Sequence, residues 1–157
     1  MGEGLDGPDV DGTFALEVAP DPDQVRTARL FAAAVARHFG AEEERVEDLK
    51  VAISEAATNS IKAHREAGIT EPVTVKAESS RGAIRFSVVD AGPGFSAPPG
   101  PVDPNNPSTP VAGLFEGSLG LTLIQSLFPN VSIDRNETRG MTVSFSVEVE
   151  DLKNGEE

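Results

Sequence analysis

Residues 42–68 read EEERVEDLKVAISEAATNSIKAHREAG and predict one long helix that ends at Gly68. At about 100° per residue, the apolar side chains of this helix collect on one arc, together with one serine and one histidine. The members of that arc are Val46, Leu49, Ile53, Ala57, Ser60, Ile61 and His64. Glu55 and Asn59 fall outside the arc. The residues between Asn59 and the arc are all small: Ala52, Ala56 and Ala63.

Glu55, Asn59 and Lys62 could together act on a nucleotide phosphate. Asn59 can offer its side-chain oxygen to Mg²⁺, a cation that takes oxygen ligands and shares them with phosphates. Glu55, one turn earlier, can accept a proton from a group that attacks the γ-phosphate. Lys62 can reach a phosphate oxygen as a point charge. Taken alone, Glu55 and Asn59 are more typical of ordinary solvated polar residues, and Lys62 is equally compatible with a solvated surface lysine.

A second informative stretch is FSVVDAGPGF at residues 86–95, where an apolar strand ends at Asp90 and two glycines follow. A carboxylate in this position can accept a hydrogen bond from the amino group of adenine. Gly92 and Gly94 allow the backbone to approach a base without a Cβ in the way. No GxxxxGK[ST] motif occurs in the chain, so the pattern indicates an ATP site that is not a P-loop.

Size and charge narrow the class of protein. A chain of 157 residues suits one domain, which we place at residues 12–150. Its formal net charge of −13 disfavours direct binding to nucleic acid or anionic lipid, because such contacts need clustered Lys or Arg. The chain has no cysteine and no apolar stretch near the roughly 20 residues of a membrane span. We therefore expect a cytoplasmic protein without direct nucleic-acid or membrane contacts.

The order of predicted elements indicates an α+β fold. Strands are expected at 13–18, 73–78, 83–90, 131–134 and 141–149, and helices at 25–39, 42–67 and 119–128. This order favours a two-layer sandwich, with helices on one face of a mixed, mostly antiparallel sheet. We expect residues 1–11 to be disordered, residues 95–118 to form a Pro/Gly-rich lid, and residues 151–157 to be an acidic tail.

These motifs together resemble those of the GHKL (Bergerat-fold) ATPases, the superfamily of gyrase, Hsp90, histidine kinases and MutL. The N-box resembles Glu55, Asn59 and Lys62, and the first glycine box resembles Asp90, Gly92 and Gly94. The second glycine box resembles the stretch that begins Gly117, Ser118, Leu119 and Gly120. The final Gly-x-Thr strand of the superfamily resembles Gly140, Met141 and Thr142. The four motifs occur in the order and spacing of the superfamily.

Within that superfamily the chain most resembles the anti-sigma-factor serine/threonine kinases (RsbW-like), above all at residues 53–59, ISEAATN. The resemblance implies a bacterial regulator of transcription that binds ATP and Mg²⁺ and sequesters an alternative sigma factor. It implies phosphorylation of a STAS-type anti-anti-sigma partner on serine, and a homodimer. By position, Glu55 would be the catalytic base and Asn59 the Mg²⁺ ligand. Asp90 would bind adenine, with Thr142 nearby through water.

The sequence departs from the family pattern at three places. Ser118 replaces a glycine of the second glycine box, and Glu116 stands where relatives can carry an arginine. His64 stands one position after the usual histidine of the N-box, on the core arc, and is expected to be packed. Three alternatives to an active kinase therefore stay open. They are a partner-switching module with a silent ATP site, a stand-alone ATP-binding domain of a histidine kinase, and a structural domain without nucleotide.

Overall fold

The computed structural model describes residues 12–92, 119–136 and 139–149. The predictions for the N-terminal segment, the lid and the acidic tail lie outside these ranges. So do three predicted site residues, Gly94, Gly117 and Ser118, together with Glu116.

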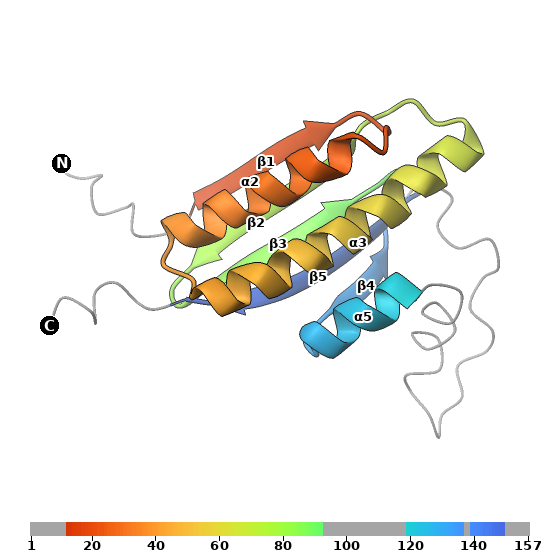
Figure 1. Cartoon of the computed structure of the whole chain (residues 1–157). Helices are drawn as coiled ribbons and strands as arrows, with labels where there is room; N and C mark the ends of the chain where they lie inside the picture. The colour runs from red at the N-terminus through yellow and green to blue at the C-terminus, as the bar shows by residue number, and fades with distance from the viewer. Residues whose placement is uncertain (1–11, 93–118, 137–138, 150–157) are drawn as a thin grey trace, which may run out of the picture.

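The described ranges form an α+β fold with the predicted order of elements. The elements are β1 (Gly12–Val18), α2 (Gln24–His38), α3 (Glu43–Ala67), β2 (Val73–Ser80), β3 (Ala83–Val89), α5 (Leu119–Leu127), β4 (Ser132–Arg135) and β5 (Met141–Glu148). Gly68 follows α3, as predicted. All helices lie on one face of the sheet (Figure 1). None of the described helices is both long enough and apolar enough to cross a bilayer.

The five strands form one sheet in the order β1-β2-β3-β5-β4. The sequence predicted a mixed, mostly antiparallel sheet, and every strand pair in the described sheet is antiparallel. The register aligns Val75, Val88 and Val143 in one row across the sheet. It also brings the end of β3 beside the start of β5, because Val89 pairs with Thr142. Asp90 therefore emerges next to the first residues of β5.

Helices α2 and α3 cover the apolar face of the sheet, and α5 lies beside α3 (Figure 1). Every member of the arc predicted for α3 is buried. Leu30 on α2 is 52% exposed. The buried residues of α2 are mostly alanines: Ala28, Ala32, Ala33, Val35 and Ala36. These small side chains let α2 pack closely, and they leave the larger Leu30 on the outer surface.

Three phenylalanines join α5 to the centre of the sheet. Phe86 and Phe145 pair across β3 and β5, with ring centroids 6.4 Å apart. Phe128, just after α5, stacks on Phe145 at 4.6 Å. The guanidinium of Arg45, on α3, lies 4.3 Å from the centroid of the Phe128 ring. This cluster holds the second half of the chain against α3.

We predict that Phe145→Ala lowers the free energy of unfolding by about 3–5 kcal/mol, because it removes a fully buried ring and leaves a cavity. Phe14→Ala is the matched control, since Phe14 lies on edge strand β1 and is 37% exposed. Its loss should be clearly smaller. Chemical denaturation of both variants measures the difference, and equal losses would contradict this account of the core.

Candidate functional site

The carboxylate of Asp90 is the best-connected side chain at the predicted site. Its Oδ1 accepts hydrogen bonds from the backbone N–H groups of Gly92 and Met141, each at 3.0 Å. Its Oδ2 accepts a hydrogen bond from the hydroxyl of Ser60 on α3, at 2.8 Å. A carboxylate offers about four acceptor positions. Three are used by described residues, and no other described residue occupies the fourth, at Oδ2.

The backbone of Asp90 is held as firmly as its side chain. Its N–H donates to the carbonyl of Met141 at 2.9 Å, and its carbonyl accepts from Asn136 Nδ2 at 3.2 Å. Asn136 Oδ1 in turn accepts from the hydroxyl of Thr142 at 2.7 Å. Thr142 was predicted to lie near Asp90, and this network links the two through Asn136.

His64 is completely buried, as predicted, and both of its ring nitrogens are hydrogen-bonded. Nε2 lies 2.9 Å from the backbone nitrogen of Ala91, and Nδ1 lies 2.9 Å from the carbonyl oxygen of Glu71. Because the amide of Ala91 can only donate, Nε2 is the acceptor and Nδ1 carries the proton that is given to Glu71. His64 therefore ties the end of α3 to the segment that follows Asp90.

Asn59 and Glu55 lie on α3 and are both partly buried. The side-chain nitrogen of Asn59 is buried and has no hydrogen-bond partner among the described residues. A buried donor without a partner costs free energy, so the site suits an oxygen-rich ligand at this point. The two ends of a carboxamide can exchange by rotation, so the same position can present an oxygen to a cation.

Lys62 lies apart from this network. Its exposed side chain lines a groove of about 420 Å³ between the start of α2 and the second half of α3. The other residues along the groove are Pro22, Val25, Thr58, Ile61, Arg65 and Glu66. The structure thus brings Ser60 and His64 to Asp90 but places Lys62 toward α2. Its predicted contact with a phosphate stays a prediction.

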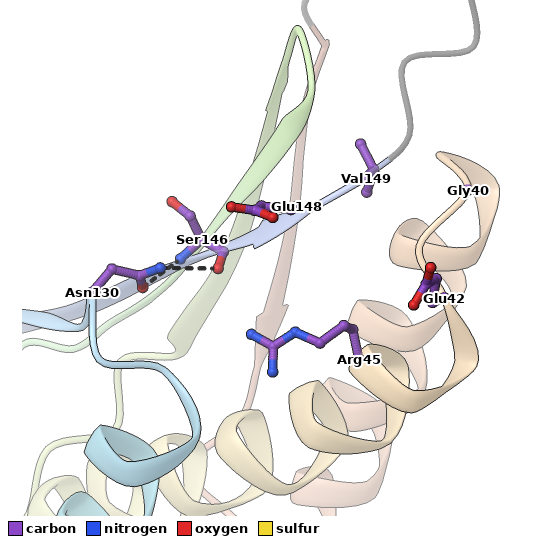
Figure 2. Close-up of a pocket in the computed structure, with 7 residues that line it drawn as sticks. All are labelled: Gly40, Glu42, Arg45, Asn130, Ser146, Glu148 and Val149. Carbon is purple, nitrogen blue, oxygen red and sulfur yellow. Dashed lines mark hydrogen bonds between the residues drawn. The ribbon is translucent and has the colours of Figure 1, made fainter. Parts of the chain in front are cut away.

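A second hollow, of about 500 Å³, lies near the start of α3 and the end of β5 (Figure 2). It is lined by Gly40, Glu42, Arg45, Asn130, Ser146, Glu148 and Val149. Asn130 is bound to the backbone of Ser146 on one wall, and Arg45 faces it from α3. None of the predicted site residues within the described ranges lines this hollow, which lies at the opposite end of β5 from Met141.

A family model described as a histidine kinase-like ATPase domain matches residues 18–147. The serine-protein kinase RsbW of Oceanobacillus iheyensis is 32% identical over 133 residues, which cover 83% of this chain and 83% of that kinase. The chain belongs to the RsbW family of serine-protein kinases. RsbW of Bacillus subtilis is 30% identical over 133 residues, which cover 83% of this chain and 82% of the relative. These relatives confirm the predicted family and identify the chain as a serine/threonine kinase by type.

Two solved structures share the fold of this RsbW-family chain. One contains the RsbU and RsbW domains of Rv1364c from Mycobacterium tuberculosis, with a TM-score of 0.60 and 18% identity. The match covers 87% of this chain and 32% of that longer one. The other is the SiaB–SiaC complex from Pseudomonas aeruginosa, with a TM-score of 0.57, 11% identity, and coverage of 85% of this chain and 88% of the matched one. At these identities the likeness concerns the fold.

Sequence reasoning missed the residues that support Asp90 in this RsbW-family site. Ser60 and His64 were expected only to pack in the core, and Asn136 was not singled out. Gly140 and Met141 were seen only as parts of a strand motif. The sequence did contain one signal for Ser60 and His64. Both are polar residues on an otherwise apolar helix arc, and buried polar side chains need hydrogen-bond partners. No local pattern points to Asn136.

We predict that Gly140→Ala disrupts this network. Gly140 has φ +100°, and a Cβ at this position would overlap the carbonyl of Asp90. We expect a loss of about 2–4 kcal/mol in unfolding free energy, from backbone strain and the forced shift of Asp90. Gly82→Ala is the matched control, because Gly82 has φ +81° but nothing within 4 Å of the added Cβ. It should cost about 1 kcal/mol. Equal losses in denaturation would show that Asp90 is not constrained as described.

Proposed function

We propose that this RsbW-family chain is an anti-sigma factor that sequesters an alternative sigma factor and phosphorylates a STAS-type anti-anti-sigma partner on serine, with ATP and Mg²⁺. Family membership supports the kinase activity. The observation that carries the nucleotide site is the carboxylate of Asp90, held by three donors and left with one open acceptor. Asn59, on the adjoining helix, has a buried amide without a partner among the described residues.

These groups fit Mg-ATP at two separate points. The open acceptor on Asp90 suits the amino group of adenine, which donates hydrogen bonds. Asn59 suits the phosphate end, where its carboxamide oxygen can bind Mg²⁺. The described residues hold no cluster of three or more His, Asp or Glu that could bind a metal by themselves. A Mg²⁺ ion at Asn59 would therefore be shared with nucleotide phosphates, as is usual for this cation.

The proposed reaction transfers the γ-phosphoryl group to a serine of the partner. ATP would supply the phosphoryl group, and Mg²⁺ held by Asn59 would neutralise charge on it. The carboxylate of Glu55 accepts the proton of the attacking serine hydroxyl while the new P–O bond forms. The bond from the γ-phosphorus to the bridging oxygen breaks, and ADP leaves. Asn59 lies one helical turn from Glu55 on α3 and would hold the phosphates through Mg²⁺.

The proposed partners and setting follow from the family and the charge. A formal net charge of −13 suits a regulator that acts on transcription through proteins and does not bind DNA itself. We propose that the chain works as a homodimer in the cytoplasm and that its partner docks near α2. The exposed Leu30 on this helix offers apolar surface for such a contact.

We predict that Asn59→Ala abolishes stabilisation by Mg-ATP. In the wild type, ligand at about 100 times the dissociation constant should raise the melting temperature by about 5–10 °C. The variant should lose this rise, because it lacks the oxygen that binds Mg²⁺. Thr58→Ala, an exposed neighbour on the same helix, is the control and should keep it. A full rise in Asn59→Ala would refute the assignment of Asn59.

We predict that Glu55→Gln stops phosphorylation of the partner but keeps the thermal rise with Mg-ATP, because the amide cannot accept a proton. The measurement is transfer of labelled phosphate to a STAS protein under saturating Mg-ATP. Glu47→Gln is the control, since Glu47 lies on the surface of the same helix and pairs there with Lys50. Phosphotransfer at the wild-type rate in Glu55→Gln would rule out Glu55 as the base.

A silent partner-switching module is the second candidate function. It is favoured by Glu116 and Ser118 at the second glycine box, and by the absence of Lys and Arg from residues 96–116. These features weaken the positive potential that a triphosphate needs. The measurement is phosphate transfer by the wild-type chain under saturating Mg-ATP. Tight partner binding without any transfer would support this second function.

A further inference from the structure

The two edges of the described sheet differ in length and in charge. β1 forms one edge and β4 the other (Figure 1). β4 spans only four residues, and two of them, Asp134 and Arg135, are charged and exposed. β1 spans seven residues and carries a single charge, at Glu17. Short, charged edge strands resist pairing with another chain, whereas long strands with little charge are templates for it.

β1 lacks the features that keep an edge strand unpaired. All of its residues pair in continuous register with β2, so no bulge twists the strand away. It contains no proline and no lysine, the residues that most often protect an edge. β2 is its only neighbour among the described strands. The outer side of β1 can therefore accept a further strand.

The side of β1 that faces α2 is apolar and only partly covered. Phe14 and Leu16 alternate along this side of the strand. Phe14 is 37% exposed, and its ring meets that of Phe39, just after α2, edge to face with centroids 5.8 Å apart. Leu16 and Phe39 are themselves only partly buried against the core. A further strand would remove this apolar surface from water, which favours its binding.

The sequence of β1 is complementary to itself in the antiparallel direction. When two copies of the strand overlap fully, Ala15 faces Ala15 of the second copy at the centre. Phe14 then lies opposite Leu16 of the second copy, and Thr13 lies opposite its Glu17. Apolar side chains meet apolar ones, and the two Glu17 carboxylates are kept apart. A second copy of this chain therefore fits the edge without a clash of charge or polarity.

We propose that two copies of this chain pair β1 with β1 about a two-fold axis, so that their sheets become one continuous sheet. A two-fold axis presents the same surface on both copies, as in most soluble dimers. This inference deepens the homodimer of the proposed function and rests on it. Because α2 lies next to β1, the two α2 helices would flank the axis (Figure 1). A partner that docks near α2 would then meet a surface made by both copies.

The first test changes the charge at the centre of the proposed interface. Ala15 is exposed, so the single chain should tolerate a charged side chain there. Ala15→Lys and Ala15→Glu each place like charges opposite one another, and each should raise the dissociation constant of the dimer at least about tenfold. Sedimentation equilibrium of the full chain measures this constant. An equimolar mixture of the two variants should restore the dimer, because opposite charges then face each other.

The second test uses the absence of cysteine from the sequence. Ala15→Cys introduces the only thiol of the chain, and residues that face each other across an antiparallel pair have Cβ atoms about 4.5–5.5 Å apart. A short thiol-specific cross-linker should therefore join two copies. Asp134→Cys is the matched control, since Asp134 is an exposed residue of the other edge strand. It should stay uncross-linked at the same concentration.

The outcomes separate the place of contact from the homodimer itself. A wild type that sediments as a monomer would overturn the proposed homodimer and this inference with it. A wild-type dimer that persists in both charged variants would place the contact elsewhere and overturn the inference alone. Charged variants that stay dimeric but no longer bind a sigma factor or a STAS protein would assign the edge to a strand of that partner, which also overturns it. If Ala15→Lys does not fold, cross-linking of Ala15→Cys still decides.

Discussion

The site depends on a single carboxylate that joins three distant parts of the chain. Asp90 is bound by Ser60 from α3, by Gly92 from its own loop and by Met141 from the start of β5. Hydrogen bonds to a charged acceptor are stronger than those between neutral groups, so this junction is among the firmest in the fold. It links α3 to the end of β3 and to the start of β5.

Helix α3 carries core residues, residues that support Asp90 and the proposed phosphate-site residues on different parts of its surface. Apolar residues such as Ile53 and Ile61 hold it on the sheet. Ser60 and His64 face the end of β3, and Glu55 and Asn59 lie outside the core arc. Because a helix is stiff over this length, the base end and the phosphate end of the proposed site would keep a constant separation. An enzyme gains from such rigidity, since reacting groups must be held in place before the reaction begins.

The close packing around Asp90 also explains where small residues are needed. Gly140 leaves room for the carbonyl of Asp90, and Ala63 leaves room for Gly92. A larger side chain at either position would push the segment after β3 away from its donors.

The amino-acid sequence by itself determined the elements, the family and the residue types of the site. Residues 42–68 predict α3 because helical periodicity is a local property, and the motif at Asp90 is likewise carried by adjacent residues. Only the tertiary structure decided that Ser60 and His64 serve Asp90, that Asn136 holds its carbonyl, and that Leu30 is exposed. Those outcomes depend on which segments meet in space. A buried serine that packs in a core and one that orients a carboxylate have the same local sequence pattern, and they differ only in the partner that folding brings to them.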